Sequence, residues 1–218
     1  IHRGASACPS RCDTISHMPN TVPSSQGVPT EVPLDIVTGR VIRDYLGVQA
    51  GESLVVIVDD GADAAVAEAL YAHGVEAGAE AALVRIPMRE FSGAEPPAAV
   101  AAAMRGADVL VSVTKRSLYH TRATGEAKAA GTRGAFNSPP TLDAWTHGAM
   151  TADFFEIRGE AEQVADRLRG ADRVRVTSPA GTDVAMSILG RDPKAWLTGI
   201  CRNPGEVSAY PGGEVSLP

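Results

Sequence analysis

The sequence predicts an α/β fold with a doubly wound, mostly parallel sheet. Short apolar runs rich in β-branched residues recur along the chain, and alanine-rich segments of helical periodicity separate them. Alternation of strands and helices is typical of parallel sheets, because a helix must return the chain to the end where the next strand begins. The pattern of apolar residues changes after residue 170. We therefore predict an arm (1–33), an α/β domain (34–170) and the start of a second, α+β domain (171–218).

The predicted elements begin near Leu34. Residues 35–46 space their apolar side chains as one face of a helix, and Gly47 follows where a helix commonly ends. Residues 53–58 form a short, continuous run rich in β-branched residues, which predicts a strand buried on both faces and central in the sheet. The later elements are helices over 62–77, 97–104 and 151–168 and strands over 81–86, 108–113 and 134–137.

The sequence beyond residue 170 has a different pattern from that of the α/β domain. Residues 173–177 and 183–188 alternate between apolar and polar, and turn residues lie between them, which predicts an antiparallel hairpin with one face exposed to solvent. The rest is rich in proline and glycine and holds too few apolar residues for a core of its own. We expect this second domain to be incomplete, and the chain to be a fragment of a longer protein.

The first 33 residues mix proline, serine, threonine and glycine with little apolar periodicity, so we expect a disordered arm. Cys8 and Cys12 could supply two zinc ligands, but among nearby residues only His17 could add a third. The net charge of −6 and the pI of about 5.4 speak against a nucleic-acid partner. No apolar run is long enough to cross a bilayer, and no secretory signal is evident, so we expect a cytoplasmic protein without membrane contact.

Candidate binding residues follow the third predicted strand. Arg116, His120 and Arg122 lie in a nine-residue stretch that also holds a lysine, a tyrosine and three hydroxyls. Open α/β sheets bind ligands at the carboxyl ends of their strands, so these three side chains are candidate contacts for an anion or a substrate. The alternative is that Thr121 caps the next helix and the cations are ordinary surface residues.

Other patterns exclude several chemistries. Asp59, Asp60 and Asp63 follow the first strand where a dinucleotide-binding protein would have glycines, and carboxylates would repel a pyrophosphate. These carboxylates could hold a hard cation, but capping of the helix that follows is the preferred interpretation. His73 and His147 have no partner at ligand spacing, and the motifs of zincins and serine hydrolases do not occur.

A series of short segments then points to a known family. Their ranges, in chain order, are 41–52, 93–104, 107–111, 116–122, 150–153, 174–183 and Pro211-Gly-Gly-Glu-Val215. Together they resemble the leucyl aminopeptidase family of the thermophilic aminopeptidase T and S type, from about Asp35 to the end of the chain. The same superfamily includes 2,5-dihydroxypyridine 5,6-dioxygenase, an iron enzyme of pyridine catabolism.

The resemblance implies a homodimeric metalloenzyme whose second domain holds two divalent ions, zinc or cobalt. Glu214 falls on the first metal-binding carboxylate of the family, and Gly212 and Gly213 would let the backbone turn so that Glu214 points inward. Metals held in this way activate a water that attacks the peptide carbonyl. The other ligands would lie beyond residue 218. A catalytic zinc needs about three protein ligands, so we expect the chain alone to be inactive.

Three functional hypotheses follow. The favoured one is a metallo-aminopeptidase that removes N-terminal residues from peptides, because Glu214 stands in the expected motif. The second is an iron-dependent, ring-cleaving dioxygenase of the 2,5-dihydroxypyridine type, in which residues 117–122 would contact an aromatic acid. The third is a non-catalytic α/β interaction subunit.

Overall fold

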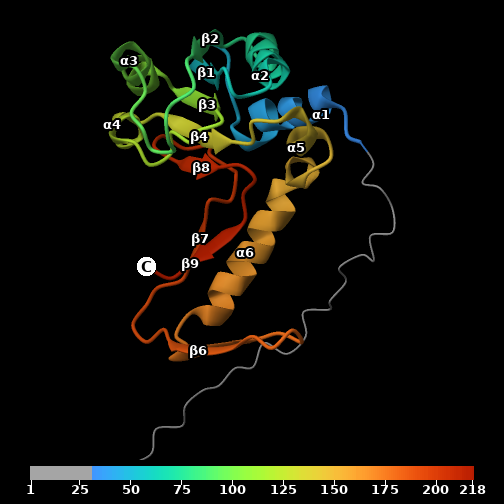
Figure 1. The fold of residues 1–218 in the computed structure, drawn as a ribbon, viewed down its shortest axis with the longest axis vertical. Coiled ribbons are helices and arrows are strands. Elements are labelled where there is room, and N and C mark those ends of the chain that lie inside the picture. Colours follow the sequence, from blue (N-terminus) through green and yellow to red (C-terminus); the bar gives the residue numbers. More distant parts are fainter. Residues whose placement is uncertain (1–30) are drawn as a thin grey trace, which may run out of the picture.

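The structure is a computed structural model that describes residues 31–218, and the predictions for Cys8, Cys12 and most of the arm lie outside this range. Five parallel strands form the central sheet in the order β2-β1-β3-β4-β8 (Figure 1). This confirms the predicted α/β class. The strands are β1 (Ser53–Asp59), β2 (Glu80–Ile86), β3 (Val109–Val113), β4 (Arg133–Ser138) and β8 (Val207–Ala209).

Helices cover both faces of the sheet, as a doubly wound fold requires (Figure 1). One face is covered by α1 (Leu34–Arg40), which continues as a π-helical turn η1 (Val41–Tyr45), and by α2 (Ala64–Glu76). The other face is covered by α3 (Ala98–Gly106) and α4 (Arg122–Ala130). The short α5 (Leu142–Thr146) and η2 (Ala149–Thr151) follow β4.

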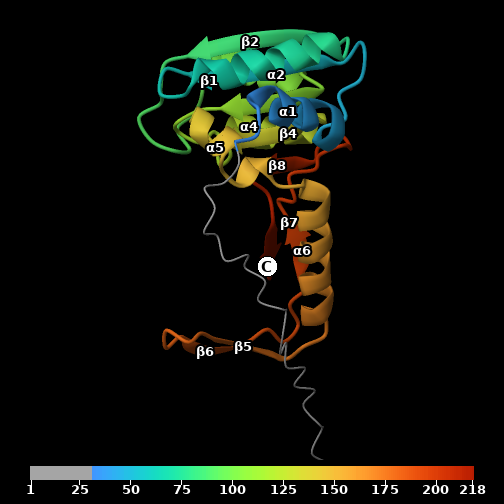
Figure 2. The ribbon, with the colours of Figure 1, turned by 90° about the vertical axis from the view of Figure 1, so that its right-hand side faces the viewer.

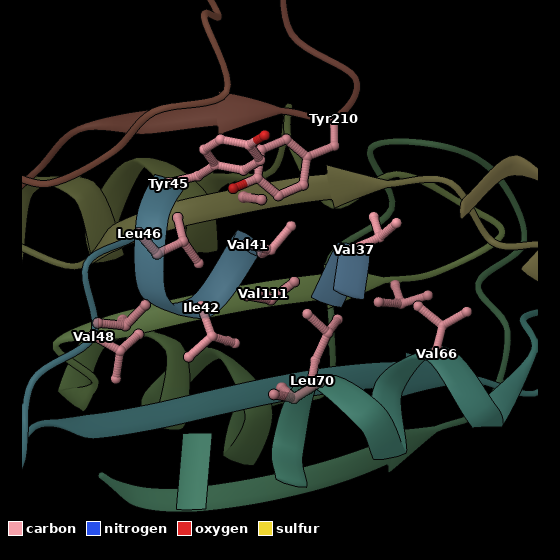
Figure 3. Close-up of a cluster of buried hydrophobic side chains, with 14 of the residues drawn as sticks. Val37, Val41, Ile42, Tyr45, Leu46, Val48, Val66, Leu70, Val111 and Tyr210 are labelled. Carbon is pink, nitrogen blue, oxygen red and sulfur yellow. The ribbon is translucent and has the colours of Figure 1, made fainter. Parts of the chain in front are cut away.

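The core consists of two apolar clusters, one on each face of the sheet. Strand β1 contributes to both, because its side chains alternate: Val56 packs toward α1 and α2, whereas Ile57 packs toward α3 and α4. Figure 3 shows the first cluster, in which Ile42 and Leu70 from the helices meet Val111 of β3. The prediction of a first strand buried on both faces is confirmed.

Beyond the sheet, the chain extends as a long helix with two small ribbons. Helix α6 (Phe154–Leu168) runs away from the sheet, and β7 (Lys194–Trp196) pairs antiparallel with β9 (Glu214–Ser216) beside it (Figures 1 and 2). At its far end lies the predicted hairpin, β5 (Arg173–Thr177) with β6 (Asp183–Ser187). We expected one solvated face, but both faces of this hairpin are exposed and only Val174 is partly buried.

Strand β8 returns the chain to the sheet from beyond residue 170. It pairs with β4, and the Tyr210 amide donates to the Asn137 carbonyl at 2.7 Å. Cys201 and Tyr210 are buried in the same cluster as Phe154. Residues from both sides of position 170 thus share one core, which explains how a loop-rich segment with few apolar residues is held. Among the helices that the structure describes, none has the length and apolar character needed to span a membrane.

Candidate functional site

The carboxyl ends of β1 and β3 mark the point where the chain turns to opposite faces of the sheet, the usual ligand crevice of such folds. Here the buried carboxylate of Asp59 joins the two strand ends. It accepts hydrogen bonds from the Gly61 amide at 3.0 Å and from the Lys115 amide at 3.0 and 3.1 Å. A Cβ on Gly61 would lie only 2.7 Å from the Lys115 Cβ. Asp59 therefore stabilises the edge of the sheet, and its carboxylate is already engaged.

The two neighbouring carboxylates are also engaged within the protein. Asp60 pairs with Arg85 at 2.9 Å, and Asp63 accepts from the Leu142 amide at 2.6 Å. We expected Asp63 to cap the helix that follows it, but its side chain caps α5 and makes no cap bond to α2. Within residues 31–218, no three His, Cys, Asp or Glu side chains lie together as metal ligands would.

The amino end of α4 already binds an internal carboxylate. Glu95 accepts from the Arg122 amide at 2.6 Å and from the Ala123 amide at 3.2 Å, and the Thr121 hydroxyl accepts from the Thr124 amide at 3.1 Å. These amides are the donors that a bound anion would use. The predicted capping role of Thr121 is confirmed, and an external anion would have to displace Glu95.

The three candidate contacts of this loop have exposed side chains. Arg116, His120 and Arg122 all face solvent. Arg122 pairs with Glu126 at 3.5 Å, and the His120 ring meets the edge of Tyr119 with 5.0 Å between centroids. These side chains are accessible to a ligand, and their role as substrate contacts stays a prediction.

Tyr119 connects this loop with the β7–β9 ribbon. Burial raises the pKa of the Tyr119 phenol, the nearby Trp196 side chain opposes that rise, and the charge of Glu214 adds to it. Trp196 and Glu214 are directly paired across the ribbon, which places their side chains on the same face. The structure thus brings Glu214 to the side of the molecule that carries Tyr119 and His120.

Glu214 itself is exposed. We expected Gly212 and Gly213 to turn the Glu214 side chain inward, but in the structure this side chain faces solvent. The glycines serve a different purpose: a Cβ on Gly212 would lie 2.4 Å from the Thr198 carbonyl carbon, and Gly213 has a φ of 117°. Both positions thus favour glycine because of close packing and left-handed backbone.

A cavity of about 350 Å³ lies between α4, α6 and residues 195–208. Trp196 lines it, and the Lys128 ammonium lies 5.7 Å from the centroid of the indole ring. Cys201 forms part of its wall, and burial raises the pKa of this thiol to about 12. These cavity residues were not among the candidate site residues predicted from the sequence. The one available signal was a tryptophan in a segment otherwise poor in apolar residues.

Comparison with known proteins shows which family this chain resembles. A family model described as 2,5-dihydroxypyridine 5,6-dioxygenase matches residues 44–217. Among solved structures, the 2,5-dihydroxypyridine dioxygenase of Pseudomonas putida KT2440 is similar with a TM-score of 0.62 and 19% sequence identity. The similarity covers 84% of this chain and 54% of that one, so the chain spans about half the length of that relative. No curated protein matches the sequence.

These matches correct the favoured functional hypothesis. We expected an aminopeptidase, a metallopeptidase hydrolase active in proteolysis, and the family match points to the dioxygenase branch instead. The physical reason lies in which residues carried the resemblance. Most of the matching segments lie in the α/β framework before residue 170, and a fold framework does not specify a reaction. Glu214 alone could not distinguish a peptidase from an oxygenase.

Proposed function

This chain belongs to the 2,5-dihydroxypyridine 5,6-dioxygenase family, and on that premise we propose that it contributes to an iron-dependent enzyme that opens a dihydroxylated pyridine ring with dioxygen. The observation that carries the proposal is the extent of the family match. It runs from residue 44 to residue 217 and so includes the sheet, α6 and the β7–β9 ribbon.

A complete iron site does not fit the described residues. Non-haem iron oxygenases commonly hold the metal with two histidines and one carboxylate, with open positions left for substrate and oxygen. Residues 31–218 contain no such group of three ligands, and the Glu214 side chain is exposed. We therefore assign no step at iron to this chain. Glu214 remains a proposed ligand that other residues would have to complete.

We assign this chain the binding and orientation of the substrate. Arg116, His120 and Arg122 present exposed donors at the carboxyl edge of the sheet, where a hydroxylated ring could be held by its oxygens. Tyr119 links this edge to the face that carries Glu214. Homodimerisation stays a prediction, and sedimentation of the purified protein would check it.

The proposal is tested by oxygen consumption. The complete gene product is loaded with ferrous iron and mixed with 2,5-dihydroxypyridine in an oxygen electrode. The same protein loaded with zinc or cobalt is assayed on leucine p-nitroanilide. We expect iron-dependent oxygen uptake and no release of p-nitroaniline. Peptidase turnover without oxygen uptake would overturn the proposal.

Two variants test the assigned residues. We expect His120→Gln to lower kcat/KM about tenfold, the loss of one hydrogen bond to an ionised group. His147→Gln, at the residue that follows α5, is the matched control and should leave kcat/KM unchanged. We expect Glu214→Gln to lower the bound iron, whereas the exposed Glu160→Gln on α6 should leave it unchanged. Equal iron content in both would remove Glu214 from the site.

A further inference from the structure

We propose that Trp196 and Lys128 form a recognition surface for one planar ring that carries an acidic oxygen. The ring would stack on the indole of Trp196, which lines the 350 Å³ cavity, in place of the Lys128 ammonium that now lies 5.7 Å from the indole centroid. The flexible lysine side chain would then shift so that its ammonium binds the acidic oxygen of the ring. The identity of the ring as a hydroxylated pyridine rests on the proposed function, and Trp196 and Lys128 would form a binding surface additional to Arg116, His120 and Arg122. The surface itself is inferred from the packing and the charges around the two residues.

Trp196 is exposed yet held in place. Its exposed fraction is 41%, whereas the other tryptophan, Trp145, is fully buried. Pairing with Glu214 fixes the backbone of Trp196, and the β7–β9 ribbon lies beside α6 (Figure 1). A fixed, solvent-facing indole provides a stacking surface with little loss of conformational entropy on binding, because it has few rotatable bonds.

Lys128 is the cation available to a ligand at this cavity. Within residues 31–218 its ammonium takes part in no ion pair. Arg158, also at the cavity, is paired with Glu162 at 2.8 Å. The fourth charged group, Glu206, accepts from the Arg202 and Asn203 amides at 2.8 and 2.9 Å and from the Asn203 side chain at 2.7 Å.

Part of the cavity wall offers apolar surface to the faces of the ring. Ile200 and Val207 supply apolar surface, and the Cys201 thiol stays protonated because burial raises its pKa to about 12. The volume is at the lower end of the range of roughly 300–1,000 Å³ typical of small-molecule sites. One ring of pyridine size is therefore the class of ligand that matches this space, with the oxygen directed to Lys128.

The test measures binding without catalysis. The full chain, treated with a chelator and kept free of oxygen, is titrated with 2,5-dihydroxypyridine by isothermal calorimetry. We expect saturable binding that Lys128→Met weakens about tenfold, the loss of one charge-assisted hydrogen bond. Trp196→Leu should weaken it by a similar factor or more through lost stacking. Pyridine, which lacks the acidic oxygen, and cyclohexane-1,4-diol, which lacks the planar ring, should bind far more weakly.

Lys194→Met is the matched control. Lys194 is exposed on the same strand as Trp196, where it lies opposite Ser216 of β9, and it does not line the cavity. We expect this variant to bind like the parent. Equal affinity of Lys128→Met and the parent, or equal loss in both lysine variants, would overturn the inference. Binding without oxygen uptake would contradict only the proposed function, whereas uptake with an unchanged KM in Lys128→Met would contradict only the inference.

Discussion

Replacing Tyr210 by alanine should lower the free energy of unfolding by about 4 kcal/mol, because it empties a packed position between the sheet and the segment after α6. Tyr210 is 3% exposed and lies near Tyr45 in the first apolar cluster (Figure 3). Its ring lies 5.4 Å from that of Phe154, which is stacked on Tyr45 at 4.6 Å. Truncating a buried aromatic residue costs about 3–5 kcal/mol, and a lost aromatic pair adds about 1 kcal/mol. Total stabilities of about 5–15 kcal/mol make this a large loss.

Removing only the hydroxyl of Tyr210 should have the opposite effect on stability. It is buried and has no hydrogen-bond partner among residues 31–218, and burial raises its pKa well above the ordinary value. Because an unpaired buried hydroxyl costs about 1–3 kcal/mol, Tyr210→Phe should raise the free energy of unfolding by about 1 kcal/mol.

Urea unfolding followed by circular dichroism measures both changes. Phe91→Ala is the control, because Phe91 is 59% exposed and should change stability by less than about 0.5 kcal/mol. If Tyr210→Ala left stability unchanged, residues 200–210 would not be packed against the sheet. If Tyr210→Phe destabilised the protein, the hydroxyl would have a hydrogen-bond partner that the described residues do not supply.

Two further predictions concern titratable groups in the same part of the fold. The Glu52 carboxylate accepts hydrogen bonds from the Arg133 guanidinium at 2.7 and 2.8 Å, which lowers the pKa of Glu52 in the folded protein. The contribution of Glu52 to stability should therefore be complete above its unfolded pKa of about 4.3. It should be lost as the pH falls through the lower pKa of the folded state. Glu52→Gln should cost about 3 kcal/mol at pH 7 and show less loss in acid urea titrations; full stability at pH 7 would contradict this. In a Cys8→Ser, Cys12→Ser background, Cys201 should not react with a thiol reagent at pH 8 until the protein is unfolded, because its pKa is about 12; rapid labelling of the folded protein would refute its burial.

Much of the fold could be predicted because its strands carry local signals. Residues 54–58 and 109–111 are apolar throughout, and all of these side chains are buried in the structure. Strand β8 could not be predicted, because it is three residues long and pairs with β4, some 70 positions earlier. Its placement depends on contacts that no local pattern encodes, including the burial of Tyr210 against Phe154.

The candidate site was only partly predictable for the same reason. His120 and Glu214 stood out by residue type and motif, but their relation depends on Tyr119 reaching the β7–β9 ribbon. The engagement of the α4 amides by Glu95 was also invisible, because 27 positions separate Glu95 from Arg122. Sequence patterns therefore identified candidate groups, whereas the partners that occupy or complete them are set by tertiary packing.

The most direct test of the central claim follows the oxygen atoms. The complete gene product, loaded with iron, is incubated with 2,5-dihydroxypyridine under isotopically labelled dioxygen, and the ring-opened product is examined by mass spectrometry. We predict that both labelled oxygen atoms appear in the product. A product without label, formed by addition of water, would contradict dioxygenase chemistry for this chain.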